Sequence, residues 1–443
     1  MKLETPFSTP NIKVHSKRRA ALVKTLKEGI VILPTAAECI RNADSHYEYR
    51  WDSFFYYLTG FREPEAVLVM TLGKKPKQIL FCREKNLERE IWDGYRFGPA
   101  LAREAFAFDA AHTYAELDAC LPELMADQPV IYTPMGTDSS WDRRVSSWLN
   151  AVRAKVRTGV SAPTEIRDVR AIIANMRLIK DEREIDIMRR AAKISSDAHR
   201  RAMRVARPGM YEFEVEAELL HEFVKNGARQ PAYGSIVGTG ANACILHYRE
   251  NNAQIKKGDL MLIDAGCELE SYAADITRTF PVGGKFSGPQ KDVYELVLAS
   301  QLASTKAVKP GAAFADYHDV ATRVLVRGLI DLKLCKGSVD GVIESGAFRQ
   351  FYMHRAGHWL GLDVHDAGDY KQGGKWVKLQ PGMVVTVEPG LYIRPAKNVP
   401  KAFWNIGVRI EDDVLVTKKG NEVLTASCPK TVKDVEAAVN AAN

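Results

Sequence analysis

The stretch LIDAGCELESYAADITRTF constrains the fold more than any other part of the chain. It predicts two strands, 259–265 and 273–280, joined by a tight turn centred near residues 269–270. That register places Asp264 opposite Asp275. Like charges that face each other destabilise a hairpin, and Asp is depleted in strands. The pair therefore indicates either a solvated surface hairpin or a site with a compensating cation.

With 443 residues, the chain is long enough for two domains. We place them at 1–175 and 176–443. Short strands alternate with helices in the first domain, which predicts an α/β fold. The predicted strands are 29–33, 66–70, 78–82 and 129–132, and the predicted helices are 17–27, 114–125 and 139–155. A charged segment after residue 180, with apolar residues at helical spacing, predicts the helix that opens the second domain.

The second domain contains a short internal repeat. GDLMLIDAG (258–266) and GMVVTVEPG (382–390) share one pattern, in which an acid stands two residues before the final glycine. Each is followed by a second acid-bearing strand, 274–280 and 408–416. A pseudo-two-fold arrangement would bring these acids together at the centre of the domain.

Charge and cysteine content exclude several classes of protein. The net charge of +7 is small for this length, and no clustered basic run predicts nucleic-acid binding. No apolar run is long enough to span a bilayer, and the basic N-terminus lacks the apolar core of a secretion signal. The seven cysteines are scattered without a Cys-x-x-Cys pair, which predicts free thiols in a reducing, cytoplasmic compartment.

Five residues form the candidate metal site. They are Asp264, Asp275, His358, Glu388 and Glu411. Four carboxylates and one imidazole suit Mn²⁺ or a similar divalent ion, and two ions would balance the four charges. Taken singly, each residue has a structural explanation: Glu388 could end a strand, Glu411 could be solvated, and His358 could be a core histidine.

Histidines gather near these acids. His354, His358 and His365 lie within twelve residues, and His247 lies in CILHYREN. If the segment were helical, His354 and His358 would share a face. Neutral histidines beside a metal-activated intermediate can donate hydrogen bonds or protonate a leaving amine. The GTGANA segment (238–243) matches a dinucleotide motif only weakly, because no long strand precedes it, and we interpret it as a turn beside His247.

The motifs LIDAG…ADITRTF, MHRAGHWLGLDVHD, TVEPGLYI and GVRIEDD resemble those of aminopeptidase P, a Xaa-Pro aminopeptidase of the pita-bread metallopeptidases (family M24). RNADSHYEYRWDSFFYYLTGFREPEAVLV resembles the N-terminal domain of that family, so the resemblance covers both domains. It implies a creatinase-like α/β domain followed by an α+β pita-bread domain with two Mn²⁺ ions. The MHRAG segment differs from the family pattern, which leaves substrate preference open.

The resemblance also implies roles for individual residues. Asp264 and Asp275 would ligate one ion, His358 and Glu388 would complete the other, and Asp275 and Glu411 would bridge. Glu388 would also transfer the proton, and His247 and His365 would stabilise the scissile carbonyl. The proline pocket would be formed by His354, Arg409 and Tyr370. Asp44 and Trp92 would help to shape the substrate entrance. A homodimer or homotetramer is expected.

The resemblance thus implies release of the N-terminal residue from peptides with proline in second position. Proline lacks the amide N–H by which general peptidases align their substrates, so a dedicated pocket is needed. Two alternatives stay open: a proline dipeptidase with the same site, and a module that binds peptides without catalysis. Cleavage of Xaa-Pro-Yaa against Xaa-Pro distinguishes the first, and loss of Mn²⁺ binding would indicate the second.

Overall fold

The computed structural model describes residues 12–441. The chain divides into two compact units, the first ending at Met176 and the second beginning at Arg177. Each unit has its own sheets and its own buried apolar cluster. Among the described residues, none of the helices combines the length and the apolar character needed to cross a membrane.

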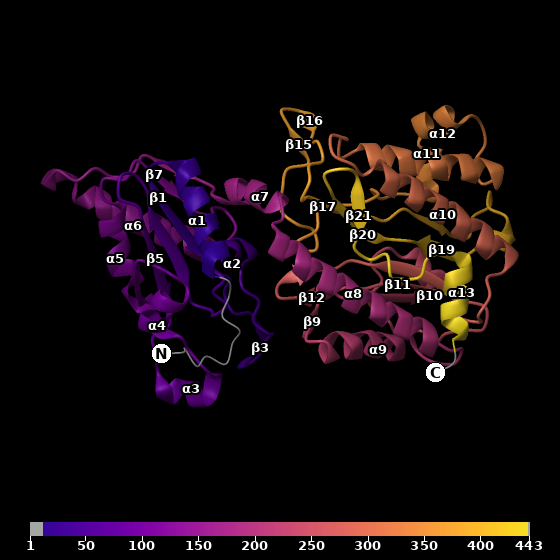
Figure 1. The fold of residues 1–443 in the computed structure, drawn as a ribbon, viewed down its shortest axis with the longest axis horizontal. Coiled ribbons are helices and arrows are strands. Elements are labelled where there is room, and N and C mark those ends of the chain that lie inside the picture. Colours follow the sequence, from indigo (N-terminus) through magenta and orange to yellow (C-terminus); the bar gives the residue numbers. More distant parts are fainter. Residues whose placement is uncertain (1–11, 442–443) are drawn as a thin grey trace. The chain divides into compact units, whose positions relative to one another are not determined.

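The first unit is built on a mixed six-stranded sheet (Figure 1). Its strands, in sheet order, are β6 (Ala110–Thr113), β5 (Lys77–Cys82), β4 (Val67–Thr71), β1 (Ile30–Pro34), β7 (Val130–Tyr132) and β8 (Glu165–Arg167). A separate hairpin joins β2 (Ile40–Asn42) and β3 (Ser45–His46). The helices are α1 (Ile12–Leu26), α2 (Ser53–Thr59), α3 (Leu87–Asp93), α4 (Gly98–Ala105), α5 (Leu117–Met125) and α6 (Ser139–Ala154). The next helix, α7 (Arg170–Leu178), begins in the first unit and ends in the second.

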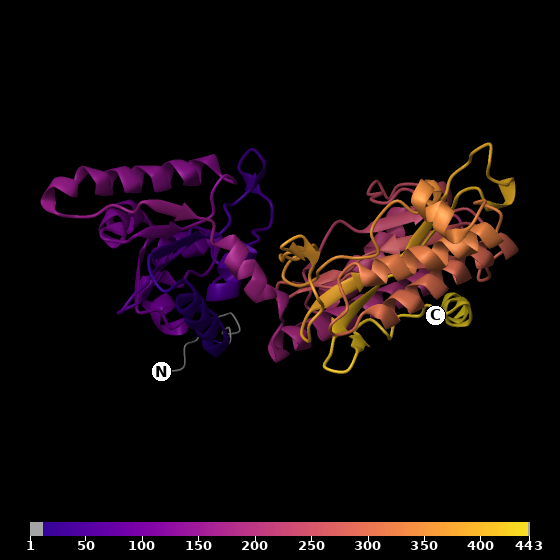
Figure 2. The same cartoon turned by 90° about the horizontal axis from the view of Figure 1, so that it is seen from above.

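Alternating residues of the central strands face opposite layers of helices. Ile30 and Ile32 pack in one cluster with Leu121 and Trp148, which belong to α5 and α6. Figure 2 shows the sheet between α6 and α1. The four predicted strands are present as β1, β4, β5 and β7, whereas the outer strands β6 and β8 were not predicted.

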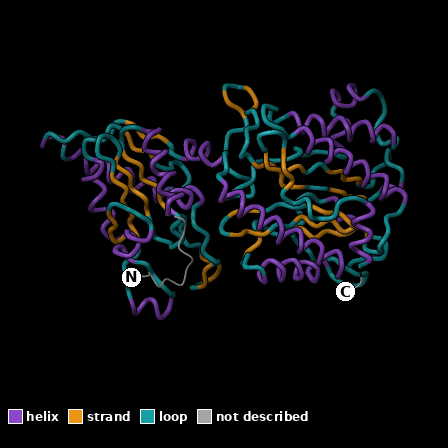
Figure 3. The backbone as a smooth tube through the Cα atoms, in the orientation of Figure 1, coloured by secondary structure: helices purple, strands orange, loops and turns teal. Residues whose placement is uncertain are grey.

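The second unit combines short sheets with long helices (Figure 3). Its strands are β9 (Gln230–Pro231), β10 (Ile236–Thr239), β11 (Leu260–Asp264), β12 (Cys267–Leu269), β13 (Tyr272–Ala273), β14 (Thr277–Pro281), β15 (Lys371–Gln372), β16 (Lys375–Trp376), β17 (Val384–Val387), β18 (Gly390–Ile393), β19 (Ile406–Arg409), β20 (Asp412–Val416) and β21 (Asn421–Val423). Its helices are α8 (Glu182–Val205), α9 (Glu212–Lys225), α10 (Gly288–Ala307), α11 (Asp316–Asp331), α12 (Val339–Ser345) and α13 (Val432–Asn440). Short 3-10 helices occur in the first unit at η1 (Tyr114–Glu116) and η2 (Val156–Thr158). In the second unit they occur at η3 (Gly240–Cys244), η4 (Ala347–Gln350) and η5 (Lys401–Phe403).

The predicted internal repeat is visible in the order of elements. The helix pair α8–α9 precedes the antiparallel pair β11–β14, and the helix pair α10–α11 precedes the antiparallel pair β17–β20. Figure 1 shows one helix pair along each half of the strands. The acids predicted to meet come from these two halves, with Asp264 ending β11 and Glu411 directly preceding β20.

The hairpin from Leu260 to Pro281 is present, but its predicted register is wrong. Asp264 lies opposite Thr277, and Asp275 is its diagonal neighbour. The turn falls at Glu270 and Ser271, one residue later than predicted, and both have left-handed φ angles of 48° and 78°. A two-residue hairpin turn favours positive φ at both positions. Neither Glu nor Ser is typical of positive φ, so the residue types did not indicate that the turn lies one residue later.

The segment that carries His354 and His358 is not helical. It runs extended beside β17, because the amide of Thr386 donates to the carbonyl of His358 and the amide of Glu388 donates to that of Ala356. The spacing of four residues therefore does not place the two histidines on a helical face. Instead, backbone pairing brings His358 beside Glu388.

Candidate metal centre

The predicted site residues of the second domain line one pocket of about 780 Å³, a size typical of ligand sites. They are His247, Asp264, Asp275, His354, His358, His365, Tyr370, Glu388, Arg409 and Glu411. Asp44 and Trp92 lie in the first unit, where Asp44 is exposed between β2 and β3 and Trp92 is 83% exposed on α3. Their predicted role at the substrate entrance stays a prediction.

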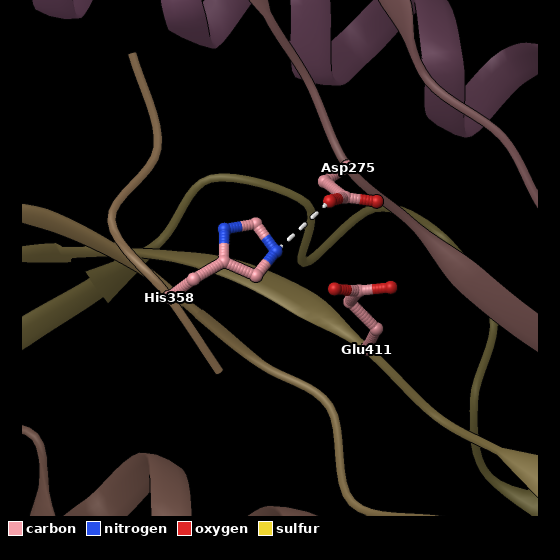
Figure 4. Close-up of side chains that lie close together, drawn as sticks. All are labelled: Asp275, His358 and Glu411. Atoms are coloured by element: carbon pink, nitrogen blue, oxygen red, sulfur yellow. Dashed lines mark ion pairs between the residues drawn. The ribbon is translucent and has the colours of Figure 1, made fainter. Parts of the chain in front are cut away.

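Three of the predicted ligands form a compact cluster. Asp275, His358 and Glu411 each offer one donor atom, and these atoms all lie within 4.8 Å of one another. Figure 4 shows the three side chains pointing toward a common centre, with a dashed line between His358 and Asp275. His358 Nε2 lies 3.4 Å from a carboxylate oxygen of Asp275. Thr277 donates a 2.6 Å hydrogen bond to Glu411 and holds that carboxylate in place.

Glu388 joins the cluster from the end of β17. One of its carboxylate oxygens lies 3.8 Å from His358 Nε2, and the other lies 3.8 Å from His354 Nδ1. The carboxylate is thus placed between two histidines of the neighbouring extended segment.

Asp264 is held by partners on two sides. Arg409 forms a 2.6 Å ion pair with one oxygen, and the hydroxyl of Tyr233 donates a 2.7 Å hydrogen bond to the other. The same hydroxyl also contacts Asp275. Tyr233 therefore bridges the two aspartates that the hairpin places diagonally.

The electrostatics of the acids are those of crowded, buried carboxylates. Burial raises the pKa of Asp275, and burial together with the charges of Asp275 and Glu388 raises that of Glu411. Burial also raises the pKa of Glu388 to about 7, although His358 and Arg409 oppose the rise. Desolvation and mutual repulsion both disfavour the charged forms. A bound cation removes this penalty, so the set fits divalent metal.

The histidines divide into two groups. Burial alone would lower the pKa of His358, but Asp275 and Glu388 raise it to about 9. Burial and the charge of Arg409 lower the pKa of His354 to about 3, and burial and His358 lower that of His365. His354 Nε2 lies 2.9 Å from the hydroxyl of Tyr392. His354 and His365 are therefore neutral at pH 7.

Sequence reasoning missed several supporting residues. Tyr233 and Tyr392 both line the pocket and hold predicted site residues, yet an isolated tyrosine carries no local signal. Glu212 was also missed. It is fully buried and accepts hydrogen bonds from Thr239, Asn242, Tyr248 and Ala253 around the segment that carries His247. The sequence shows only an acid at the start of an amphipathic helix, which does not distinguish a buried acceptor from a solvated acid.

Known proteins resemble the chain over almost its whole length. The family model for metallopeptidase family M24 matches residues 186–418, and that for the aminopeptidase P N-terminal domain matches 15–132. The Xaa-Pro aminopeptidase of Escherichia coli K12 is 46% identical over 429 residues, which cover 96% of this chain and 97% of that protein.

Solved structures show the same relationship. The Pseudomonas aeruginosa aminopeptidase PepP superposes with a TM-score of 0.96 at 48% identity, covering 98% of this chain and 99% of that one. A zinc-substituted E. coli aminopeptidase P in complex with product gives a TM-score of 0.95 at 44% identity, with the same coverage. The predicted fold, a creatinase-like domain followed by a pita-bread domain, is confirmed. The chain belongs to metallopeptidase family M24, and within that family it is a metalloaminopeptidase of the Xaa-Pro aminopeptidase group.

Proposed function

We propose that the site holds two divalent cations, with Mn²⁺ as the expected metal, on Asp264, Asp275, His358, Glu388 and Glu411. The cluster of Asp275, His358 and Glu411 supports this assignment, because three donor atoms within 4.8 Å converge in a pocket of crowded acids. Four carboxylates match the charge of two divalent ions. The related zinc-substituted enzyme supports a divalent metal of some kind.

Two cations, when bound, supply Lewis acidity that polarises a scissile carbonyl and acidifies water. The chain's own residues then orient the peptide and move protons. We assign proton transfer to Glu388, whose carboxylate lies near both His354 and His358. We assign hydrogen-bond donation to the developing oxyanion to His247 and His365, which are exposed and line the pocket.

The proline ring is assigned to the side of the pocket formed by His354, Tyr370 and Arg409. Tyr392 supports two of these residues, since its hydroxyl lies 2.9 Å from both His354 Nε2 and an Arg409 nitrogen. A rigid wall of neutral imidazole, phenol rings and a paired guanidinium suits a substrate residue that offers no amide N–H.

A peptide panel tests this function. The protein is stripped by chelation, reloaded with Mn²⁺, Zn²⁺ or Mg²⁺, and assayed on Xaa-Pro-Yaa, Xaa-Ala-Yaa and Xaa-Pro. Hydrolysis of Xaa-Pro-Yaa with release of Xaa, and two bound metal ions per chain by elemental analysis, are expected. Cleavage confined to the dipeptide would indicate a proline dipeptidase, and one metal ion per chain would refute the two-metal assignment.

Assembly and location complete the proposal. The seven cysteines are all free in the structure, and five of them are buried, which supports a cytoplasmic protein. We expect a homodimer or homotetramer. Light scattering coupled to gel filtration measures the assembly, and a monomer at micromolar concentration would contradict it.

A further inference from the structure

Two arginines line the pocket and have no role in the proposed chemistry. They are Arg249, which follows the His247 segment, and Arg355, which follows His354. Both side chains are exposed, whereas the metal-site acids are buried or half-buried. Among the described residues, no carboxylate pairs with either guanidinium, and neither guanidinium donates a hydrogen bond to the protein. Both are therefore available to a ligand in the pocket.

Arg355 is held in position without being neutralised. Its guanidinium carbon lies 4.9 Å from the centre of the Trp376 ring, which also lines the pocket. The Lys371 ammonium lies 4.4 Å from the centre of the same ring. Stacking on an aromatic face fixes a guanidinium while leaving its planar edge of N–H donors open. That edge is the part of arginine that binds carboxylates in bidentate geometry.

Arg249 has a similarly defined place on its own segment. Its side chain passes over Gly234, where a Cβ atom would lie 3.6 Å from the guanidinium nitrogen Nε. The preceding residue, Tyr248, is anchored by a 2.7 Å hydrogen bond to buried Glu212. The backbone that presents Arg249 is thus fixed by a contact outside the pocket.

The pocket is therefore electrostatically graded. Acids occupy its buried part, and the exposed part carries two unpaired guanidinium groups. A peptide whose N-terminal ammonium enters toward the acids places the residues after proline toward the exposed part. An anion there would be attracted by the arginines and kept out of the acidic interior by repulsion.

We infer that Arg355, assisted by Arg249, forms a carboxylate subsite for the part of the substrate that follows proline. This inference rests on the proposed function. The shared ligand chemistry is a carboxylate, supplied by an acidic side chain in third position or by the free C-terminus of a tripeptide. The subsite makes the enzyme prefer short or acidic Xaa-Pro peptides over neutral and basic ones.

Four peptides separate these sources: Ala-Pro-Ala-amide, Ala-Pro-Ala with a free C-terminus, Ala-Pro-Asp-amide and Ala-Pro-Lys-amide. Each is assayed for kcat/KM with the Mn²⁺-loaded enzyme, and the neutral amide is the internal reference. The wild-type enzyme is expected to favour at least one carboxylate peptide by about three- to tenfold, the range of a single partly exposed charge-assisted contact. The peptide that gains identifies the source of the carboxylate.

Variants then assign the preference to Arg355. The quantity compared is kcat/KM of the favoured carboxylate peptide divided by kcat/KM of the neutral amide. In Arg355→Gln this ratio should fall toward one, and Arg355→Lys should retain part of the preference. Arg355→Glu should reverse the preference in favour of Ala-Pro-Lys-amide. The matched control is Arg349→Gln, which removes an equal charge from an exposed position in η4 that does not line the pocket. Its ratios should equal those of the wild type.

Two results would overturn the inference. One is an unchanged ratio in Arg355→Gln, and the other is an equal loss in Arg349→Gln, which would show a general charge effect. Failure of the proposed function looks different, because then none of the four peptides is cleaved by the metal-loaded wild type.

Discussion

Lys180 and Asp366 form an ion pair of 2.9 Å in which both side chains are only 1% exposed. Arg177 adds a second cation at 2.5 Å from the other oxygen of Asp366. The two cations lie at the start of the second unit, and the acid directly follows His365. The cluster therefore fastens the segment that carries His365 to the chain just before α8.

Replacement of Asp366 by Asn should strongly destabilise the second unit. Two buried cations would lose their counter-charge, which costs about 3–5 kcal/mol in comparable buried pairs. Denaturant unfolding measures the loss. The matched control is Asp363→Asn, because Asp363 pairs with the same Arg177 but is 41% exposed and should cost about 1 kcal/mol or less. Equal losses in the two variants would contradict the assignment.

The same ion pair predicts a pH dependence. Burial alone would raise the pKa of Asp366, but Lys180 and Arg177 outweigh it and lower the pKa below its ordinary value. In the unfolded chain an Asp has a pKa of about 4, so the stabilisation is fully present above about pH 4. It is lost as the pH falls through the lower pKa that Asp366 has in the folded protein. The difference in unfolding free energy between wild type and Asp366→Asn should be constant from pH 7 to 5. The difference should shrink at lower pH. A difference that grew there would refute the lowered pKa of Asp366.

Glu212 should support the His247 segment from outside the pocket. Its two oxygens accept five hydrogen bonds, all from N–H or O–H donors. Glu212→Gln replaces one acceptor with a donor and leaves the Tyr248 hydroxyl and a backbone amide poorly paired. We expect a loss of about 1–3 kcal/mol in stability and a lower kcat/KM. The control is Glu216→Gln on the same helix, which should change neither quantity, because Glu216 makes no such contacts with the residues that the structure describes.

Substitution of single ligands tests the metal centre. Asp264→Ala and Glu411→Ala should each lower hydrolysis by more than about a hundredfold, since even outer-shell changes at metal sites cost 10–100-fold. Circular dichroism should show both variants folded, and elemental analysis should show reduced metal content. Full activity in either variant would refute the two-metal assignment.

Metal removal should loosen the region around Asp275 and Glu411 before the rest of the chain. In the metal-free protein, burial raises the pKa of both carboxylates, and repulsion adds to the rise, from Asp264 at Asp275 and from Asp275 at Glu411. Mn²⁺ at a hundred times its dissociation constant should raise the unfolding free energy by about 2.7 kcal/mol for each site that it fills. Hydrogen exchange of the β14 and β20 amides reports the local effect. Uniform exchange with and without Mn²⁺ would contradict it.

Much of this architecture was predictable because strand and ligand patterns are local. The apolar runs that became β1, β4, β5 and β7 are bounded by turn residues, and the repeat of acid-bearing strands indicated a shared centre. Even so, the register of the central hairpin was missed. Glu270 and Ser271 adopt left-handed conformations that their residue types do not announce.

The supporting residues could not be predicted, because their partners are distant in sequence. Tyr233 reaches Asp264 across 31 residues, and Lys180 reaches Asp366 across 186. Such contacts depend on the packed fold and leave no periodic trace in the chain. The path of the His358 segment was hidden for the same reason, since its extended form is set by pairing with β17.

The division of the centre between two halves of the second unit has a consequence for biosynthesis. Asp264 and Asp275 come from the first half, and His358, Glu388 and Glu411 come from the second. A growing chain on the ribosome cannot assemble the full set until residue 411 has emerged and both halves have docked. If these five residues hold the metal as proposed, unfinished chains lack the complete ligand set and are expected to bind metal less well than the finished molecule.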